Sequence, residues 1–233
     1  MQKTKYPRTF NLPNSGSDTS DDVWWSDFKP FEGKDVVITE KLDGENTTIY
    51  PDGSVHARSL DSRHHPSRSW IKSYASEIGH KIPDGLRVCG ENMYAFHSIL
   101  YTELDTYFYV FGIYEGEQCL SWLDTKEICD DIGLALVPII YEGEWKDDLV
   151  KDDLEKSGRY PTFKLKKGLQ PEYPNNFEPC NAEGFVIRLQ DTFQYQDFNK
   201  CCAKYVSPQF RGLMRDTHWA STAVFPNRKA SNP

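Results

Sequence analysis

Residues 36–50 read VVITEKLDGENTTIY, and this stretch decides how the rest of the chain is interpreted. The apolar run 36–38 predicts a strand that leads toward Lys41. Gly44 then predicts a turn, and residues 46–50 predict a second strand. Lys41 therefore stands between an apolar strand and a glycine turn, with carboxylates on both sides.

A lysine in this setting is a candidate nucleophile. Its amine must lose a proton before it can attack, and nearby cations or burial can lower its pKa enough for that. Glu40 would point to the opposite face of the strand from Lys41, where it could accept a hydrogen bond from a ligand. A surface strand end with salt-bridged charges is the alternative that this stretch alone leaves open.

The remaining pattern predicts an α+β fold. Strands and helices are interspersed without a βαβ rhythm, which favours mostly antiparallel sheets flanked by helices. After an extended arm at 1–31, strands are expected at 54–59, 86–91, 106–114, 135–141, 184–189 and 201–206. Helices are expected at 67–81, after Leu123 and at 145–156. The helix after Leu123 would begin with Asp124 and Glu127 as a capping box and end at Gly133. Neither common glycine-rich phosphate loop is present.

Composition limits the classes of function. The chain has 233 residues, with 27 Lys and Arg against 35 Asp and Glu, so it does not bind a polyanion by bulk charge. A nucleic acid would have to be met by local basic clusters, at Arg58, Arg63, Arg68 and Lys72, at Lys164, Lys166 and Lys167, and at Arg211 and Arg215. No apolar run reaches the roughly 18 residues of a membrane span. Six cysteines without a C-x-x-C pair predict reduced thiols in a cytoplasmic protein.

Four other segments carry groups that suit a nucleotide. Three arginines lie between Arg58 and Arg68, and guanidinium groups match phosphate oxygens, although a solvated loop explains them equally well. Glu91 follows Gly90 at a strand end, where it could bind ribose hydroxyls. Phe111 precedes a glycine in an aromatic strand and could stack on a purine, although core packing is the usual role of such rings.

The fourth segment begins at Glu183 and continues to two lysines, Lys200 and Lys204. In an extended strand their even separation places both lysines on one face, where they could hold one phosphate. The neighbouring His64 and His65 would point apart on a strand, so we do not predict a metal site there.

In this order the motifs resemble those of the covalent nucleotidyltransferases, which include ATP-dependent polynucleotide ligases and mRNA capping enzymes. The segments at 6–13, 37–48, 58–70 and 89–99 are most similar to the bacterial and phage RNA ligase family. The resemblance extends from about Tyr6 to about Trp219. It implies a nucleotidyltransferase fold and three steps: Lys41 attacks the α-phosphorus of ATP, AMP passes to an RNA 5′-phosphate, and a 3′-hydroxyl displaces AMP.

The resemblance also implies roles for individual residues. Catalytic roles fall to Lys41, Arg58, Glu183 and Lys204. Contacts with ATP fall to Glu40, Lys41, Arg58, Glu91, Phe111, Glu183, Lys200 and Lys204. Mg²⁺, or Mn²⁺, would be held largely through water, with Glu183 and Asp43 as the nearby carboxylates.

Two departures from the family pattern are visible. Cys202 stands where the first of two lysines is expected, and the residues after Val206 are too few for an OB domain. We therefore expect a single nucleotidyltransferase domain over 1–233, with an extended arm at 1–31 and a short extension at 207–233. Its partners would be RNA ends, in a nicked duplex, in the cytoplasm or, for a phage protein, in the host cytoplasm. A capping-type guanylyltransferase, a DNA ligase and a non-catalytic RNA-binding relative are the alternatives.

Overall fold

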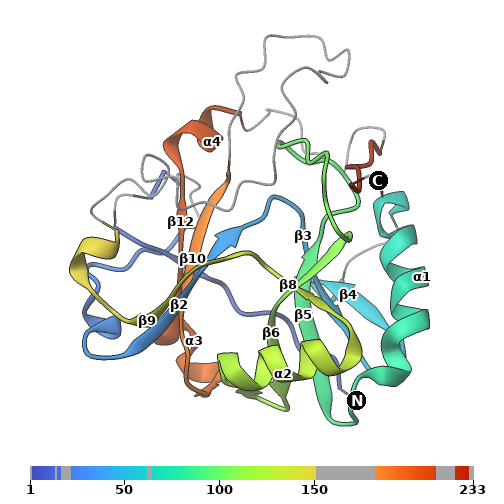
Figure 1. Ribbon diagram of the computed structural model, residues 1–233, viewed down its shortest axis with the longest axis horizontal. Coiled ribbons are helices and arrows are strands. Elements are labelled where there is room, and N and C mark those ends of the chain that lie inside the picture. Colours follow the sequence, from blue (N-terminus) through green and yellow to red (C-terminus); the bar gives the residue numbers. More distant parts are fainter. Residues whose placement is uncertain are drawn as a thin grey trace.

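Two β-sheets and a few short helices make up the fold (Figure 1). The computed structural model describes residues 2–13, 15–16, 22–61, 65–150, 182–213 and 224–230. Most neighbouring strands are antiparallel, and the parallel pairs are β1 with β12 and β6 with β8. The prediction of an α+β fold with mostly antiparallel sheets is confirmed.

The first sheet brings together distant parts of the sequence. Its five strands run in the order β1 (Phe10–Asn11), β12 (Cys202–Val206), β10 (Gly184–Leu189), β2 (Asp35–Lys41) and β9 (Ile139–Glu144). Strand β2 lies inside this sheet, and residues 36–40 are buried on both of its faces, which explains the apolar run 36–38.

The second sheet has seven strands. They run in the order β11 (Phe193–Gln194), β7 (Gln118–Cys119), β6 (Phe108–Glu115), β5 (Leu86–Asn92), β3 (Glu45–Ile49) and β4 (Val55–Ala57), with β8 (Ala135–Leu136) also paired to β6. The turn between β2 and β3 carries the chain from the first sheet to the second, so Lys41 lies at the crossing.

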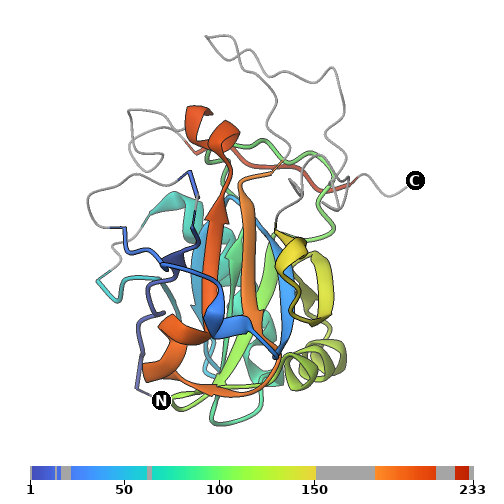
Figure 2. The same cartoon turned by 90° about the vertical axis from the view of Figure 1, so that its left-hand side faces the viewer.

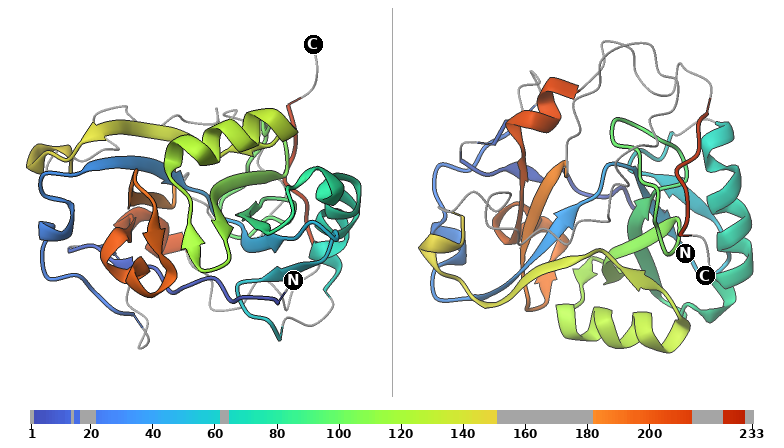
Figure 3. Two further views of the ribbon diagram at one scale, coloured as in Figure 1. Left: turned by 90° about the horizontal axis from the view of Figure 1, so that it is seen from below. Right: turned by 45° about the horizontal axis from the view of Figure 1, so that its top comes forward.

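Helices cover the second sheet and close the ends of the first (Figures 1 and 3). They are α1 (Ser69–Ile78), α2 (Trp122–Ile132), α3 (Phe198–Cys201) and α4 (Pro208–Leu213), and 3₁₀ turns lie at Lys29–Phe31, Pro66–Arg68, Gly79–Lys81, Asp147–Leu149 and Tyr195–Asp197. No helix in these described ranges has the length and apolar composition needed to cross a bilayer.

The cap of α2 differs from the prediction. Ser121 is the N-cap, and its hydroxyl oxygen accepts a hydrogen bond from the Asp124 N–H at 3.0 Å. Asp124 therefore lies inside the helix and not at its cap. Gly133 ends α2 in the left-handed conformation, as expected, with φ of 75°.

Two predicted elements are wrong or incomplete. The strand expected at 135–141 is divided into β8 and β9, because Pro138 between them has no N–H for a sheet hydrogen bond. In place of the helix expected at 145–156, the structure has a 3₁₀ turn at Asp147–Leu149, and residues 151–156 lie outside the described part.

The predicted arm is integrated into the sheet. Its residues Phe10–Asn11 form β1, and Figure 2 shows this dark blue segment beside β12. A segment from the other end of the chain, residues 224–230, bridges to the loop that follows β5 (Figure 3). There the buried Asn227 donates to the carbonyl oxygen of Met93 at 2.7 Å and holds the loop in place.

Arg188 fastens the two sheets together. It lies on β10, its side chain is buried, and it donates to the Leu120 carbonyl oxygen at 2.7 Å and to that of its neighbour Leu189 at 3.1 Å. Its guanidinium also lies over the rings of Trp122 and Phe193. A buried charge needs such partners, and Arg188 holds them while it also lines the pocket described below.

Candidate active site

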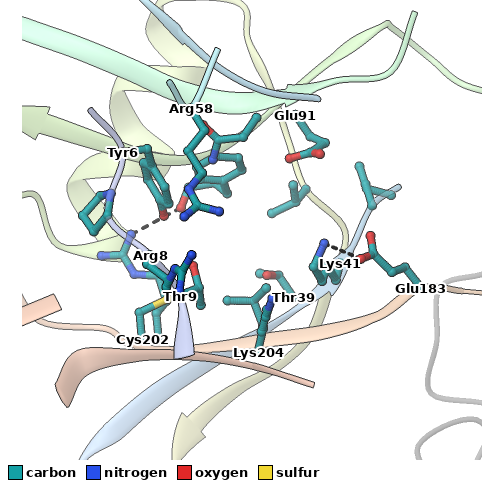
Figure 4. A pocket seen from close by; sticks show the side chains of 18 of the residues that line it. Tyr6, Arg8, Thr9, Thr39, Lys41, Arg58, Glu91, Glu183, Cys202 and Lys204 are labelled. Carbon is teal, nitrogen blue, oxygen red and sulfur yellow. Dashed lines mark hydrogen bonds and ion pairs between the residues drawn. The ribbon is translucent and has the colours of Figure 1, made fainter. Parts of the chain in front are cut away.

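A pocket of about 710 Å³ lies where β2 leaves the first sheet for the second (Figure 4). Residues of the arm, of both sheets and of α4 line it. Its volume falls in the range of roughly 300–1,000 Å³ that is typical of small-molecule sites. Of the predicted site residues, the lining includes Glu40, Lys41, Arg58, Glu91, Phe111, Glu183 and Lys204.

Lys41 forms an ion pair inside this pocket. Its Nζ lies 2.6 Å from Oε1 of Glu183, and both side chains are largely buried. Gly184 pairs with Lys41 across the two strands, and a Cβ at Gly184 would lie 1.9 Å from the carbonyl oxygen of Tyr205. Glycine is therefore required at 184 for β12 to pack beside β10 while Glu183 faces Lys41.

The charges around Lys41 control its protonation. Burial alone would lower the pKa of Lys41, but the carboxylates of Glu183, Glu91 and Asp43 raise it above its ordinary value. The amine is therefore a cation at neutral pH in this state. Burial raises the pKa of Glu91 to about 8, although Lys41 opposes that shift. A ligand that alters the charge near these carboxylates would change the proton balance of Lys41.

Asp43 holds the turn behind Lys41. Its Oδ2 accepts hydrogen bonds from the backbone N–H groups of Ser98 and Ile99, both at 2.7 Å. Burial and the charge of Glu183 nevertheless raise the pKa of Asp43 to about 7. Asp43 does not line the pocket, so the structure does not bring it to the wall where we expected it to help hold a metal ion.

Three buried side-chain oxygen atoms in the pocket lining have no hydrogen-bond partner among the described residues. They are Oε2 of Glu40, Oδ1 of Asn46 and the hydroxyl oxygen of Tyr114. Burial raises the pKa of Glu40 to about 8, so this side chain is a neutral acid at pH 7. Buried polar atoms are normally satisfied, so these three atoms fit a ligand that brings its own polar groups, as a purine nucleoside does.

Cations approach the pocket from separate elements. Burial and the charge of Lys41 lower the pKa of Lys204, whose Nζ lies 3.9 Å from Oδ1 of Asp22. Burial and the charge of Arg8 lower the pKa of Arg58. Since like charges held close together repel, an anion among them would be stabilised.

Phe111 lies on β6 and lines the pocket, as predicted for a base-stacking ring. One of its neighbours is Tyr6 of the arm, with ring centroids 5.1 Å apart in an edge-to-face arrangement. Tyr6 and Arg8 both line the pocket, although the sequence motifs assign a role to neither residue. The signal that could have indicated them is the similarity of the segment 6–13 to the family.

Lys200 is not part of the pocket, and the prediction that it shares a strand face with Lys204 is wrong. It lies in α3, before β12 begins, and its side chain is 72% exposed. Its Nζ is 3.1 Å from Oδ1 of Asp197, within the same helical turn. The rule of even separation fails because the chain is helical at Lys200 and extended only from Cys202.

The predicted basic clusters are brought together only in part. Arg58 and Arg211 line the same pocket. Arg68 instead makes a charge-assisted pair with Glu45, with its Nε 2.7 Å from Oε2. Lys72 lies on α1 with an exposed side chain and does not line the pocket. The remaining predicted members at Arg63, Lys164, Lys166, Lys167 and Arg215 lie outside the described residues.

The next question is whether the described His, Cys, Asp and Glu side chains could bind a metal ion or form disulfides. Within the described ranges, no three His, Cys, Asp or Glu side chains converge to hold a metal ion. A divalent cation that binds here would thus depend on water and on a ligand for most of its coordination, with Glu183 as the predicted protein carboxylate. Cys89, Cys119, Cys129, Cys201 and Cys202 are free and buried, and Cys180 is not described.

Comparisons with known proteins point to a family and a fold. The model of the RNA ligase family matches residues 34–206. A search of curated proteins finds no match. Among solved structures, an archaeal ATP-dependent RNA ligase is 18% identical with a TM-score of 0.53, covering 88% of this chain and 49% of its own.

A second solved structure supports the same fold. A mutant RNA ligase of Naegleria gruberi with AMP and Mn is 17% identical with a TM-score of 0.50, covering 81% of this chain and 54% of its own. This chain therefore spans about half the length of the solved ligases that it matches.

Proposed function

Because the chain belongs to the RNA ligase family, we propose that it is an ATP-dependent RNA ligase that joins 3′-hydroxyl and 5′-phosphate ends. The observation that carries this proposal is the environment of Lys41. A lysine, paired at 2.6 Å with Glu183, shares one pocket with several cations, among them Arg58 and Lys204, and with buried oxygens that lack partners among the described residues.

The proposed reaction proceeds through three displacements at phosphorus. The neutral Lys41 amine attacks the α-phosphorus of ATP, a P–N bond forms and pyrophosphate leaves. The AMP group then passes to the 5′-phosphate of RNA and frees the lysine. A 3′-hydroxyl finally attacks that 5′-phosphorus and expels AMP. Such displacements depend mainly on positioning and on neutralising charge.

The pocket residues divide these tasks. Arg58 and Lys204 would bind phosphate oxygens, Glu91 the ribose, and Glu40 with Phe111 the adenine. When bound, Mg²⁺ or Mn²⁺ would neutralise phosphate charge, and Glu183 would hold its water shell. Glu183 would also position the Lys41 amine, because it is that amine's ion-pair partner.

Labelling tests the covalent step. The protein is incubated with α-labelled ATP or GTP and Mg²⁺, then separated under denaturing conditions. We expect label on the protein from ATP, little from GTP, and none with Lys41→Ala. The matched control is Lys126→Ala, because Lys126 also pairs with a glutamate, Glu142, at 2.7 Å but lies outside the pocket lining. Equal labelling of Lys41→Ala and Lys126→Ala would refute the site.

The alternatives give different results in the same assay. Label from GTP would favour a capping-type guanylyltransferase, and sealing of DNA but not RNA nicks would favour a DNA ligase. RNA binding without any label would favour a non-catalytic relative. We expect sealing of a nicked RNA duplex, reduced by Arg58→Ala and by Glu183→Ala. Sealing that is unchanged in both variants would contradict the assigned roles.

A further inference from the structure

The N-terminal arm is attached to the protein on both sides of Arg8. Before Arg8, the Thr4 N–H donates to the Tyr50 hydroxyl at 2.9 Å, and the Tyr195 hydroxyl donates to the Lys5 carbonyl oxygen at 2.8 Å. These two contacts reach the turn between β3 and β4 and the 3₁₀ turn that precedes α3. The chain that enters Arg8 is therefore held in place.

The arm is also held after Arg8. Phe10 and Asn11 pair in parallel with Ala203 and Lys204 of β12, and the Leu12 N–H donates to the Lys204 carbonyl oxygen at 2.7 Å. Arg8 thus lies just before β1, which runs alongside Lys204 of β12.

The residues next to Arg8 restrict it further. The Tyr6 ring packs edge-to-face on Phe111 at 5.1 Å and on Phe198 at 5.4 Å. Pro7 fixes its own φ angle immediately before Arg8. A side chain on a fixed backbone loses less entropy when it binds a ligand than one on a free terminus.

The arm directs Arg8 into the pocket. Arg8 lines the pocket with Arg58 and Lys204, although its side chain remains exposed enough to meet a ligand. Figure 4 shows Arg8 and Arg58 on the side of the pocket away from Lys41 and Glu183. The two arginines are close enough that the charge of Arg8 contributes to the lowered pKa of Arg58.

Strand β12 supplies no charge at Cys202. Cys202 precedes Lys204 by two residues, so it lies on the same face of the strand, and it lines the pocket. Burial raises the pKa of the Cys202 thiol to about 12, so Cys202 is neutral. A phosphate near Cys202 would need its cations from the neighbouring elements.

We propose that Arg8 of the N-terminal arm is a phosphate-binding residue of this pocket, an inference that rests on the proposed ligase function. Its guanidinium would donate to phosphate oxygens, as a planar fork with several N–H groups does well. The phosphate belongs either to the triphosphate of ATP or to the 5′-end of RNA. The two sources are distinguished by assaying the steps separately.

The test compares Arg8→Ala and Arg8→Gln with Lys5→Ala. Lys5 is a cation on the same arm, but its side chain is exposed and does not line the pocket. Loss of a hydrogen bond to a charged group predicts a decrease of about ten- to a hundredfold in the affected step. Lys5→Ala should match the wild type, and Arg8→Lys should recover part of the loss through its charge.

Three steps are measured with each variant. They are labelling of Lys41 at limiting ATP, transfer of AMP to 5′-phosphate RNA, and sealing of RNA that is already 5′-adenylated. A decrease in the first step alone assigns the triphosphate, and a decrease in the second alone assigns the RNA phosphate. Either result supports the proposal. If the Arg8 variants equal Lys5→Ala in all three steps, the proposal is overturned.

Binding provides a readout that does not depend on catalysis. In a Lys41→Ala background, calorimetry gives the affinity for ATP and for a 5′-phosphate RNA, with the matching 5′-hydroxyl RNA as the comparison. Weaker binding of a phosphate ligand by Arg8→Gln than by Lys5→Ala supports the role of Arg8, and equal binding of both ligands contradicts it. A wild-type protein that is never labelled would refute the proposed function separately.

Discussion

The two sides of the pocket differ in charge and in how they are built. On the Lys41 side, an amine pairs with the carboxylate of Glu183 beside the buried Glu91, and short hydrogen bonds hold the turn behind it. On the arm side, the cations Arg8 and Arg58 come from separate elements, and the charge of Arg8 helps to lower the pKa of Arg58. One side holds a protonated lysine, and the other is suited to an anion.

This difference indicates that the proposed nucleophile is stored in an inactive protonation state. The carboxylates that stabilise the Lys41 cation also oppose its attack, since only the neutral amine is nucleophilic. Phosphates bound on the arm side would bring an electrophile toward Lys41. Variants that disturb one side or the other test this difference.

Glu183→Gln should have the largest effect on the Lys41 side. It keeps the shape of the side chain but removes the charge that positions the Lys41 amine at 2.6 Å and that would hold a metal ion's water shell, and these losses should outweigh the easier deprotonation of Lys41. We expect Lys41 labelling to slow by about 10²- to 10⁴-fold, the range for a group that positions protons or charge. Rapid-quench labelling at saturating ATP measures this rate.

The matched control is Glu142→Gln, which breaks the exposed Lys126–Glu142 pair of 2.7 Å. It should leave the labelling rate unchanged. A Glu183→Gln rate within about twofold of this control, a difference of less than 1 kcal/mol in the barrier, would show that the charge on Glu183 does not assist Lys41.

Asp43→Ala should destabilise the turn behind Lys41, on the same side of the pocket. It leaves the buried N–H groups of Ser98 and Ile99 without their acceptor. Each unsatisfied donor costs about 1–3 kcal/mol, so we expect the free energy of unfolding to fall by about 4 kcal/mol in urea titrations. Asp52→Ala removes a comparable hydrogen bond in an exposed turn and should cost much less. Equal losses in both variants would contradict the structural role of Asp43.

Glu40→Gln tests the burial of the carboxyl group beside Lys41. The pKa of Glu40 is about 8 in the folded protein against an ordinary 4.5, so the folded state keeps a proton that the unfolded state has lost. The free energy of unfolding should therefore fall as pH rises between these values, by about 1.4 kcal/mol per pH unit. Between about pH 6 and pH 7.5 this predicts a loss of about 2 kcal/mol from this group.

Urea titrations at several pH values measure this loss. Glu40→Gln should make the fall with pH shallower by the contribution of this one group, whereas Glu117→Gln, in the exposed turn between β6 and β7, should retain the full slope. If the free energy of unfolding falls equally steeply with pH in Glu40→Gln and Glu117→Gln, Glu40 does not contribute to the pH dependence.

The two sides also differ in how far the sequence predicts them. Lys41 is the last residue of β2, and Glu183 directly precedes β10, each near a glycine. Such local patterns place a side chain at a strand end. Arg8 has no local pattern of this kind, because its position depends on the pairing of the arm with β12, nearly 200 residues away. Pairing over such a separation is set by tertiary packing, which residue spacing does not encode.

The same reasoning explains the errors in the fold. The expected strand 135–141 ignores the missing N–H of Pro138, and the cap assigned to Asp124 belongs to Ser121. Both errors concern element boundaries, whereas β10 has the bounds that the sequence predicts. Apolar runs thus identify the buried strands, and single polar or cyclic residues decide where elements end.

The smallest expected effect is that of Lys200→Ala, compared with Lys204→Ala on the arm side. Lys204 lines the pocket, and its lowered pKa reflects burial and the nearby charge of Lys41. Losing this cation should slow labelling of Lys41 by about ten- to a hundredfold, as for a charged hydrogen bond to phosphate. Lys200 pairs with Asp197 on the exposed surface of α3, so its loss should leave the rate unchanged. A slow Lys200→Ala enzyme beside an unimpaired Lys204→Ala enzyme would contradict these roles. It would mean that the helical turn at α3 becomes extended when the nucleotide binds. Urea titrations of both variants, with and without ATP, would then have to reveal that change.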